Sequence, residues 1–548
     1  MTSGLDLSLA EENTSKAKKP AADKSGGKAQ DAGPKAAGGK DAAAKASKAG
    51  RARAKESDGK EAKEAKAKEE SLVERTLGNL AGVWRDIAFG AARTMGLTRI
   101  ALAGGDQSSI KGLMSECLQA RGGEVSARMR AAELGKTYIE LDKTGRAKFL
   151  EVLARSFAID EVSVDKAIDT YRAATDDDSR LRAGAGLRRA LEPPHLRLLR
   201  QFNDLPEGVR FLVDLRADLL ALRSDDPHMI ALDRDLKDLL TSWFDVGFLD
   251  LRLITWDSPA SLLEKLIAYE AVHQIQSWAD MRNRLDSHRR CYALFHPRMP
   301  NEPLAFVEVA LVRGLAAKVQ DLLEEKAPDG EPLKVDTAIF YSITNTQRGL
   351  NGVSFGEYLI KRVVSNLTKE LPGLKTFATL SPVPGFRGWL RKQDADFLSQ
   401  FFSEEEQGGL RALGGSDELP AALEGVLDKS AWPTDPVVVK ALKGPLMALC
   451  ARYLVSPRAD GQPLDSVARF HLRNGARLER LNWLGDVSEN GLMRSAGMMV
   501  NYLYVRGDIE KNHEAYMTDG KIVMGSDIKP LVRSERGSES PLKKLGFG

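Results

Sequence analysis

Two residues far apart in the sequence, Ser381 and His471, are the side chains best suited to chemistry, and one glycine-bearing turn accompanies them. A hydroxyl donates or accepts hydrogen bonds, and an imidazole with an ordinary pKa exchanges protons near neutral pH. Ser381 precedes Pro382 in an LSPVPGF corner, where its hydroxyl could simply satisfy the backbone of a turn. His471 lies in a mixed polar and apolar run, and it could be a buried histidine bonded to a carbonyl. From the residues alone, both interpretations stay open.

The glycine-bearing turn lies within the stretch from Thr337 to Phe386. Thr337–Ile343 is rich in β-branched and aromatic residues, which predicts a strand. Ser354-Phe-Gly-Glu357 has the spacing of a capping box, so we expect a helix to start there and to end before Pro372. A strand, a turn and a helix N-terminus present unpaired N–H groups, which predicts binding of an anion such as a pyrophosphate. The glycines have a simpler alternative explanation, because many strand-turn-helix units need them.

Several familiar sites are excluded by motifs that the sequence lacks. It has no Walker loop, no Rossmann Gly-x-Gly-x-x-Gly and no His-Glu-x-x-His. Gly352-Val-Ser354-Phe-Gly356 matches a nucleophile elbow, but the predicted strand ends well upstream, so a helix cap is the simpler interpretation. The seven histidines are scattered and the three cysteines stand far apart, so we expect no metal site and no disulfide framework. We expect His195 and His228, which lack neighbouring ligand residues, at the surface.

The elements that must position these residues fall into four parts. Residues 1–70, rich in Ala and Lys, predict a disordered tail, and residues 534–548 a second polar tail. Residues 71–240 have apolar positions at helical spacing, including Phe149 to Phe157 and Phe211 to Leu220, which predicts an all-α helical bundle that could serve oligomerisation. Residues 241–533 mix helices with short strands, which predicts a mixed α/β domain and an α+β fold class overall. The predicted strands are Cys291–Phe295, Leu304–Leu311, Thr337–Ile343 and Thr376–Leu380.

Charge and hydropathy narrow the classes of partner. The 80 Lys and Arg nearly balance the 77 Asp and Glu, giving a net charge of +3 and no electrostatic footprint for nucleic acid. No apolar run is long enough to span a membrane. The separated cysteines fit a reducing compartment. We therefore expect a cytoplasmic protein with neither nucleic acid nor membrane as a partner.

Four long stretches resemble the malonyl-CoA decarboxylase family. They are FHPRMPNEPLAFVEVAL, AIFYSITNTQRGLNGVSFGEYLIKRVV, LSPVPGF and ARFHLRNGARLERLNWLGDVSENGLMRSAGMMVNYLY. The resemblance runs from about Leu72 to Arg533, and it implies a helical domain followed by a catalytic domain similar to GNAT-type acetyltransferases. It also implies conversion of malonyl-CoA to acetyl-CoA and carbon dioxide, in malonate or fatty acid metabolism. The family implies no metal or organic cofactor, and a homo-oligomer such as a tetramer.

The resemblance also implies which residues act. The family's catalytic serine falls on Ser381 and its catalytic histidine on His471, and both are expected to meet the malonyl group. Ser354 stands where relatives carry a glutamate, so a catalytic role is not carried over to it. The family's acyl-CoA-binding segment falls on Asn351, Gly352, Val353, Ser354, Phe355, Gly356 and Glu357.

The implied reaction requires few protein side chains. Malonyl-CoA is a β-carboxy thioester, so its own thioester oxygen takes the electrons that the departing carbon dioxide leaves behind, and no cofactor is required. On this hypothesis His471 donates a proton, because its ordinary pKa lies near the operating pH, and Ser381 hydrogen-bonds the substrate. Two other hypotheses fit the same elements: an N-acyltransferase that uses acyl-CoA, and a non-catalytic acyl-CoA sensor. Only a decarboxylase yields acetyl-CoA without an acceptor.

Overall fold

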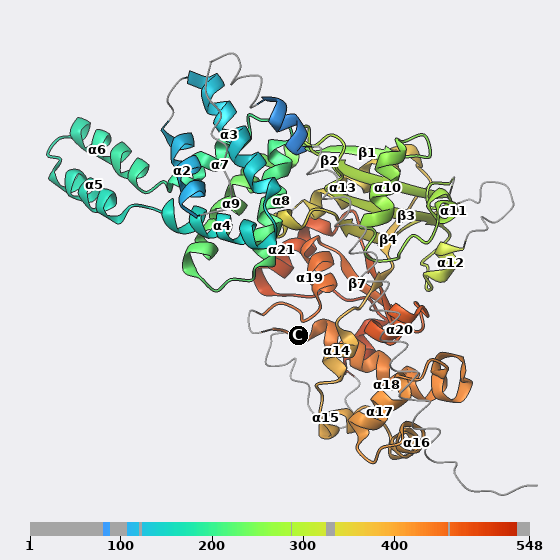
Figure 1. Cartoon of the computed structure of the whole chain (residues 1–548). Coiled ribbons are helices and arrows are strands. Elements are labelled where there is room, and N and C mark those ends of the chain that lie inside the picture. Colours follow the sequence, from blue (N-terminus) through green and yellow to red (C-terminus); the bar gives the residue numbers. More distant parts are fainter. Residues whose placement is uncertain are drawn as a thin grey trace, which may run out of the picture. The chain divides into compact units, whose positions relative to one another are not determined.

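The structure is a computed structural model of the whole chain, drawn in Figure 1. It describes residues 80–87, 107–119, 123–286, 288–324, 335–353, 355–458 and 461–533, which all belong to one compact unit, Ala62–Gly548. The predicted tails, residues 1–70 and 534–548, lie outside the described residues. The fold is α+β, as predicted, with a helical region followed by a mixed sheet.

The helical region is organised around an aromatic cluster. Trp84 lies against Phe202 and Phe211, and Tyr138 makes an edge-on contact with Phe149. The apolar positions predicted for two helices, around Phe149 and Phe211, are buried in this cluster, as their helical spacing requires. The helices are α2 Gln107–Leu118, α3 Gly123–Glu140, α4 Lys143–Ser156, α5 Glu161–Ala173, α6 Asp177–Ala190, α7 Pro194–Phe202, α8 Gly208–Ala221 and α9 Pro227–Trp243.

Two features of this region differ from the expectation of a simple bundle. Helices α5 and α6 pair with each other, and neither buries a residue in the described chain. His195, expected at the surface, is buried on α7, where its Nε2 lies 2.8 Å from an Asp235 carboxylate oxygen on α9. Its partner stands forty positions downstream, so sequence spacing gave no sign of the pair.

An eight-stranded sheet follows, with the order β1-β2-β3-β4-β5-β8-β6 and β7 paired to β8. All pairings are antiparallel except that of β4 with β5, which are parallel and pair from Thr337 to Phe340. The four predicted strands are confirmed, and four others were not predicted. The strands are β1 Asp250–Ile254, β2 Arg289–Phe295, β3 Ala305–Val312, β4 Thr337–Asn345, β5 Thr376–Thr379, β6 Ser381–Pro382, β7 Arg477–Asn482 and β8 Met499–Leu503.

Helices cover both faces of the sheet, so its central strands are buried on both sides. On β2, Tyr292 and Leu294 join the large core that contains α13, whereas Cys291, Ala293 and Phe295 pack with α10. Alternate residues of a strand point to opposite faces, which explains this division. The helices that flank the first five strands are α10 Ala260–Tyr269, α11 Trp278–Asn283, α12 Gln320–Leu323 and α13 Gly356–Glu370, with the 3-10 turns η1 Val246–Phe248 and η2 Arg348–Leu350.

A group of helices is inserted between β6 and β7. Arg387 anchors part of it, because its buried guanidinium bonds the Glu424 and Asp428 carboxylates of the same group. The helices are α14 Phe386–Leu390, α15 Ala395–Ser399, α16 Glu404–Gly414, α17 Leu419–Leu427, α18 Pro436–Val455 and α19 Ser466–Arg473, with η3 Trp432–Thr434 among them. Three more complete the chain: α20 Glu489–Ser495, α21 Ile509–Asp519 and α22 Ile528–Arg533.

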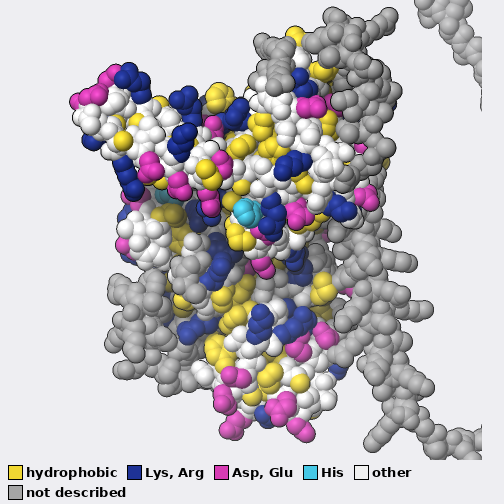
Figure 2. All heavy atoms as spheres, turned by 60° about the vertical axis from the view of Figure 1, so that its left-hand side comes forward, with side chains coloured by type: hydrophobic (Ala, Val, Ile, Leu, Met, Phe, Trp, Pro, Cys, Tyr) yellow, Lys and Arg dark blue, Asp and Glu magenta, His cyan; other side chains and the backbone are white. Residues whose placement is uncertain are grey.

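Three further observations concern the surface charge, membrane-spanning helices and metal sites. The face in Figure 2 mixes Lys and Arg with Asp and Glu side chains, in keeping with the nearly balanced charge. No helix within the described ranges is long and apolar enough to cross a bilayer. Among the described residues, no group of three or more His, Cys, Asp or Glu side chains is placed to hold a metal ion.

Candidate active site

Ser381 and His471, ninety positions apart, are brought together by the fold. Ser381 Oγ lies 3.1 Å from His471 Nε2, and both side chains are buried. Ser381 comes from β6, where it pairs with Val500 of β8, and His471 comes from α19. The two side chains that the resemblance singled out therefore meet, although no sequence pattern connects them.

The serine is oriented by the strands on either side of it. Its hydroxyl donates to Thr379 Oγ1 at 2.9 Å, and Thr379 also accepts a bond from the Tyr502 backbone N–H at 3.2 Å. The Asn501 side-chain amide donates to the Thr379 carbonyl at 2.8 Å. Because Thr379 and Asn501 are fully buried, these bonds fix the direction in which Ser381 presents its oxygen.

His471 is positioned by the cap of its helix and by contacts of its ring. The N-terminus of α19 is capped by Asp465, which accepts a bond from the Ala468 N–H at 2.8 Å. The His471 ring stacks on Tyr502 with centroids 4.5 Å apart. Its Nδ1 lies 2.8 Å from the hydroxyl of Tyr504. Packing, a helix cap and a hydrogen bond thus fix both the position and the rotation of the ring.

The directions of these bonds assign the tautomer of His471. Ser381 uses its proton on Thr379, so its oxygen accepts from the imidazole, which places the ring proton on Nε2. Nδ1 then accepts from the Tyr504 hydroxyl. Burial lowers the pKa of His471 to about 3, so the ring is neutral in the free protein at neutral pH. The expectation of an ordinary pKa near the operating pH is therefore wrong, because a ring cut off from water resists charge.

This lowered pKa predicts a pH-dependent contribution to stability. An unfolded histidine titrates near 6.5 and the folded ring near 3, so the unfolded chain binds more protons between those values. Stability from this group is complete above about pH 6.5 and is lost as the pH falls. Between about pH 7.5 and about pH 5, the wild type should lose about 2 kcal/mol more unfolding free energy than His471→Asn. Urea unfolding at both pH values measures this, and equal losses would contradict a neutral buried ring.

In the segment Asn351–Glu357, Asn351–Val353 and Phe355 lie between η2 and α13, and Gly356 and Glu357 begin α13. Asn351 and Gly352 are exposed, whereas Val353 and Phe355 are buried. The helix begins at Gly356, and Phe355 occupies its N-cap position without a side-chain hydrogen bond. The predicted start and capping box at Ser354 are therefore wrong in position, and Ser354 itself lies outside the described residues. The first N–H groups of an α-helix have no acceptor within the helix, so those of α13 can bind a ligand at its N-terminus.

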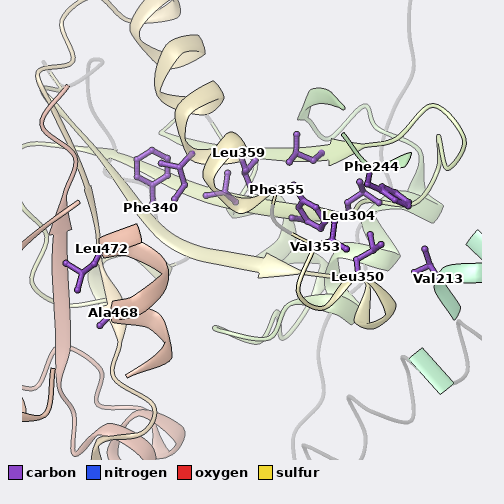
Figure 3. Packing of buried hydrophobic residues seen from close by; sticks show 14 of the residues in the cluster. Val213, Phe244, Leu304, Phe340, Leu350, Val353, Phe355, Leu359, Ala468 and Leu472 are labelled. Carbon is purple, nitrogen blue, oxygen red and sulfur yellow. The ribbon is translucent and has the colours of Figure 1, made fainter. Parts of the chain in front are cut away.

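The turn follows the C-terminal end of β4, and Ser381 follows β5, the strand that pairs with β4. In Figure 3, Phe340 of β4 lies between Leu472 of α19 and Phe355 of the turn, and all three belong to one buried cluster. Among the described residues of the segment, none is hydrogen-bonded to Ser381 or His471. The structure thus brings the two predicted catalytic residues into contact and leaves the predicted binding segment separate from them.

Several residues of the site were not predicted, among them Thr379, Asn501, Tyr502 and Tyr504. All belong to, or directly follow, strands β5 and β8. Asn501 and its neighbours Tyr502 and Tyr504 stand in a VNYLY run, whose apolar and aromatic character is typical of a buried strand. Recognising that strand could have pointed to Tyr504 near the site, but only the fold shows which side chains touch the serine and histidine.

Comparisons with known proteins agree on one family. Residues 247–541 match the model of the malonyl-CoA decarboxylase C-terminal domain, and residues 157–244 match that of the N-terminal domain. The chain is 38% identical over 424 residues to the mitochondrial malonyl-CoA decarboxylase of Anser anser anser, covering 74% of this chain and 84% of that one. It is also 38% identical over 402 residues to that of Rattus norvegicus, covering 71% and 82%.

Solved structures give the same result. The crystal structure of malonyl-CoA decarboxylase from Rhodopseudomonas palustris is similar with a TM-score of 0.68 and 41% identity, covering 78% of this chain and 99% of that one. The corresponding enzyme from Agrobacterium vitis has a TM-score of 0.68 and 41% identity, covering 77% and 99%.

Proposed function

The chain belongs to the malonyl-CoA decarboxylase family, and we propose that Ser381 and His471 carry out its chemistry while Asn351–Glu357 binds the coenzyme A part of the substrate. The reaction is that of a carboxy-lyase, which converts malonyl-CoA to acetyl-CoA and carbon dioxide. The observation that carries the proposed site is the buried contact of 3.1 Å between Ser381 Oγ and His471 Nε2.

The reaction asks little of the protein beyond position and one proton. The bond from the central malonyl carbon to its carboxylate breaks, and the electron pair moves onto the thioester oxygen as an enolate. The central carbon then takes one proton to give the acetyl group. Because the substrate is its own electron sink, its chemistry does not require a metal or an organic cofactor. Holding the breaking bond perpendicular to the thioester plane draws on binding energy from the distant nucleotide.

In this proposal His471 supplies the proton, and Ser381 turns its hydroxyl from Thr379 Oγ1 to donate to an oxygen of the malonyl group when the substrate binds. The ring is neutral before substrate binds, with its proton on Nε2 facing Ser381. A malonyl carboxylate placed beside the ring adds a negative charge, which raises the histidine pKa and favours the protonated form. The ring takes this second proton from solvent on Nδ1, which then donates to the Tyr504 hydroxyl oxygen, and the Nε2 proton passes to the enolate carbon, leaving a neutral ring. No covalent acyl-serine is needed, because decarboxylation has no acyl transfer step.

The turn between η2 and α13 suits the binding of a pyrophosphate. Gly352 has a positive φ of 80° and is exposed, so the backbone there is open to close approach. The first N–H groups of α13 point out of the helix, where the helix dipole favours negative charge. The parallel pairing of β4 with β5 ends at Phe340 and Thr379, two residues before Ser381, and we infer that the pantetheine follows a GNAT-like path past this end towards Ser381.

A product assay separates this activity from the two alternatives. Wild-type protein should release carbon dioxide and form acetyl-CoA from malonyl-CoA in a metal-chelated buffer without an amine acceptor. An N-acyltransferase would instead release free coenzyme A, and only after an amine is added. A sensor would bind malonyl-CoA without turnover. Either of these last two results in folded protein would overturn the proposed function.

We also propose a homo-oligomer and a cytoplasmic location. Val162 on α5 and Leu181 on α6 are 77% and 71% exposed, which gives the helical region an apolar surface for another subunit. A monomeric mass of the full chain in light scattering would contradict the oligomer. Cys117, Cys291 and Cys450 are buried free thiols, which suits a reducing compartment such as the cytoplasm. The animal relatives are mitochondrial by name, and fractionation of the source cells distinguishes the two locations.

A further inference from the structure

An arginine of the helical region reaches into the turn of the catalytic region. Arg216 lies on α8 and is 2% exposed. Its Nη1 donates to the Gly349 carbonyl at 2.7 Å and to the Asn351 carbonyl at 2.8 Å, and its Nε donates to the Asp233 carboxylate on α9 at 2.9 Å. One guanidinium therefore ties two peptide groups of the turn to two helices that lie more than a hundred residues upstream.

The turn is also packed tightly against α8. A Cβ atom added to Gly349 would lie 1.8 Å from the carbonyl oxygen of Val213, so only glycine fits between the turn and the helix backbone. Figure 3 shows Val213 next to Leu350 and Val353, and the three belong to one buried cluster. This packing leaves the turn little room to move, and the hydrogen bonds of Arg216 restrict it further.

These bonds set the direction of a donor on the ligand side of the turn. In a trans peptide the carbonyl and the following N–H point to opposite sides. With the Asn351 carbonyl held towards Arg216, the Gly352 N–H points away from α8. Leu350, Asn351 and Val353 use their N–H groups on carbonyls within the turn, whereas no described residue accepts from the N–H of Gly352. Gly352 is an exposed residue, and the direction of its N–H is set by the bond of Arg216 to the preceding carbonyl.

We propose that Arg216 is a positioning residue for acyl-CoA: from the helical region it fixes the Gly349–Gly352 turn in the conformation that binds the substrate. The inference rests on the proposed function of Asn351–Glu357 as the acyl-CoA-binding segment. Arg216 does not touch the substrate. It acts through the carbonyls that it holds, so its loss should weaken binding and leave the chemical step unchanged.

The test uses Arg216→Lys in the full chain, because lysine keeps the charge but cannot reach two carbonyls and a carboxylate with one planar group. The KM for malonyl-CoA and the Kd for acetyl-CoA should each rise by about 10-fold or more, with kcat within about 2-fold. Arg210→Lys is the matched control. Arg210 lies on the same helix, is equally buried and bonds Glu302 instead of the turn, so its KM should stay at the wild-type value.

Two further variants make every outcome decisive. Asp233→Asn weakens the ion pair that orients Arg216, and Asp233 is only partly buried, so this variant should fold. It replaces Arg216→Lys if that protein does not fold, and we expect a smaller rise in KM. Gly352→Ala changes the segment itself at its positive φ. If only Gly352→Ala raises KM, the role of Arg216 is overturned, whereas acyl-CoA binding by the segment Asn351–Glu357 is supported. If none of these variants changes KM or Kd, the segment is wrong as well. A rise in the Arg210 control equal to that in Arg216→Lys would also overturn the inference.

Discussion

Ser381→Ala and His471→Asn should each lower kcat by about 10²–10⁴-fold, the range typical of a lost general acid. His471 Nε2 and Ser381 Oγ lie 3.1 Å apart, and both side chains are buried, so bulk water has little access to replace either group. Because the coenzyme A part of the substrate is bound elsewhere in our proposal, the Kd for malonyl-CoA should change by less than about 5-fold. Stopped assays of acetyl-CoA formation and equilibrium binding measure the two quantities separately.

The double variant and a control sharpen this result. Residues that act as a unit are not additive, so the Ser381→Ala/His471→Asn protein should be about as slow as the slower single variant. His296→Asn removes another buried histidine, whose Nε2 lies 3.1 Å from the Trp243 carbonyl outside the site, and its kcat should stay near the wild-type value. If the variants of Ser381 and His471 turn over like the His296 control, the catalytic assignment is wrong although the activity of the family stands.

Arg284→Met should lower the free energy of unfolding by about 3–5 kcal/mol, because it leaves a buried charge without its partner. Arg284 is 3% exposed, and its guanidinium lies 2.9 Å from carboxylate oxygens of both Glu308 and Asp280. Burial already raises the pKa of Glu308 to about 7 despite the opposing charge of Arg284. Without the arginine, Glu308 has to be either charged and uncompensated or protonated.

The pH dependence identifies the cause of this loss. A carboxyl whose folded pKa is raised binds its proton more tightly in the folded state, so its contribution to stability is largest at low pH and falls as the pH rises. The deficit of Arg284→Met should therefore be smaller near pH 6 than near pH 8. Denaturant unfolding at both values measures it. Arg182→Met, which breaks an exposed pair with Asp178, should cost less than about 0.5 kcal/mol. A loss in Arg284→Met no larger than in this control would contradict the prediction.

The sequence predicts the fold best in elements that have a continuous apolar run or one clearly apolar face. The apolar runs of β2, β3 and β4 and the helical spacing of α13 are confirmed, because both faces of these elements are buried or one face is clearly apolar. Strand β7 was missed because its Arg477, Glu479 and Arg480 interrupt any apolar pattern. Arg480 instead bonds the carbonyls of Leu315 and Ala316, which are brought next to the strand only by the complete fold.

The candidate site was likewise predicted only in part. The residue types and the family resemblance single out Ser381 and His471, but neither indicates that Tyr504 would hold the ring or that burial would lower its pKa. Both properties depend on contacts between residues more than thirty positions apart. Likewise, the Ser-x-x-Glu spacing that predicted a helix start at Ser354 took no account of the packing of Phe355, which is buried at the start of α13.

The place of β8 in the sheet has a consequence for how the protein is made. β8 lies inside the sheet, paired with β5, β6 and β7, yet it is the last strand along the described part of the chain. During synthesis, β1 to β5 can assemble while β5 keeps an unpaired edge, which is the kind of edge that joins to other chains. The pocket for His471 closes only when Tyr502 and Tyr504 have left the ribosome. A nascent chain therefore carries every proposed catalytic residue for some time before it can have any activity.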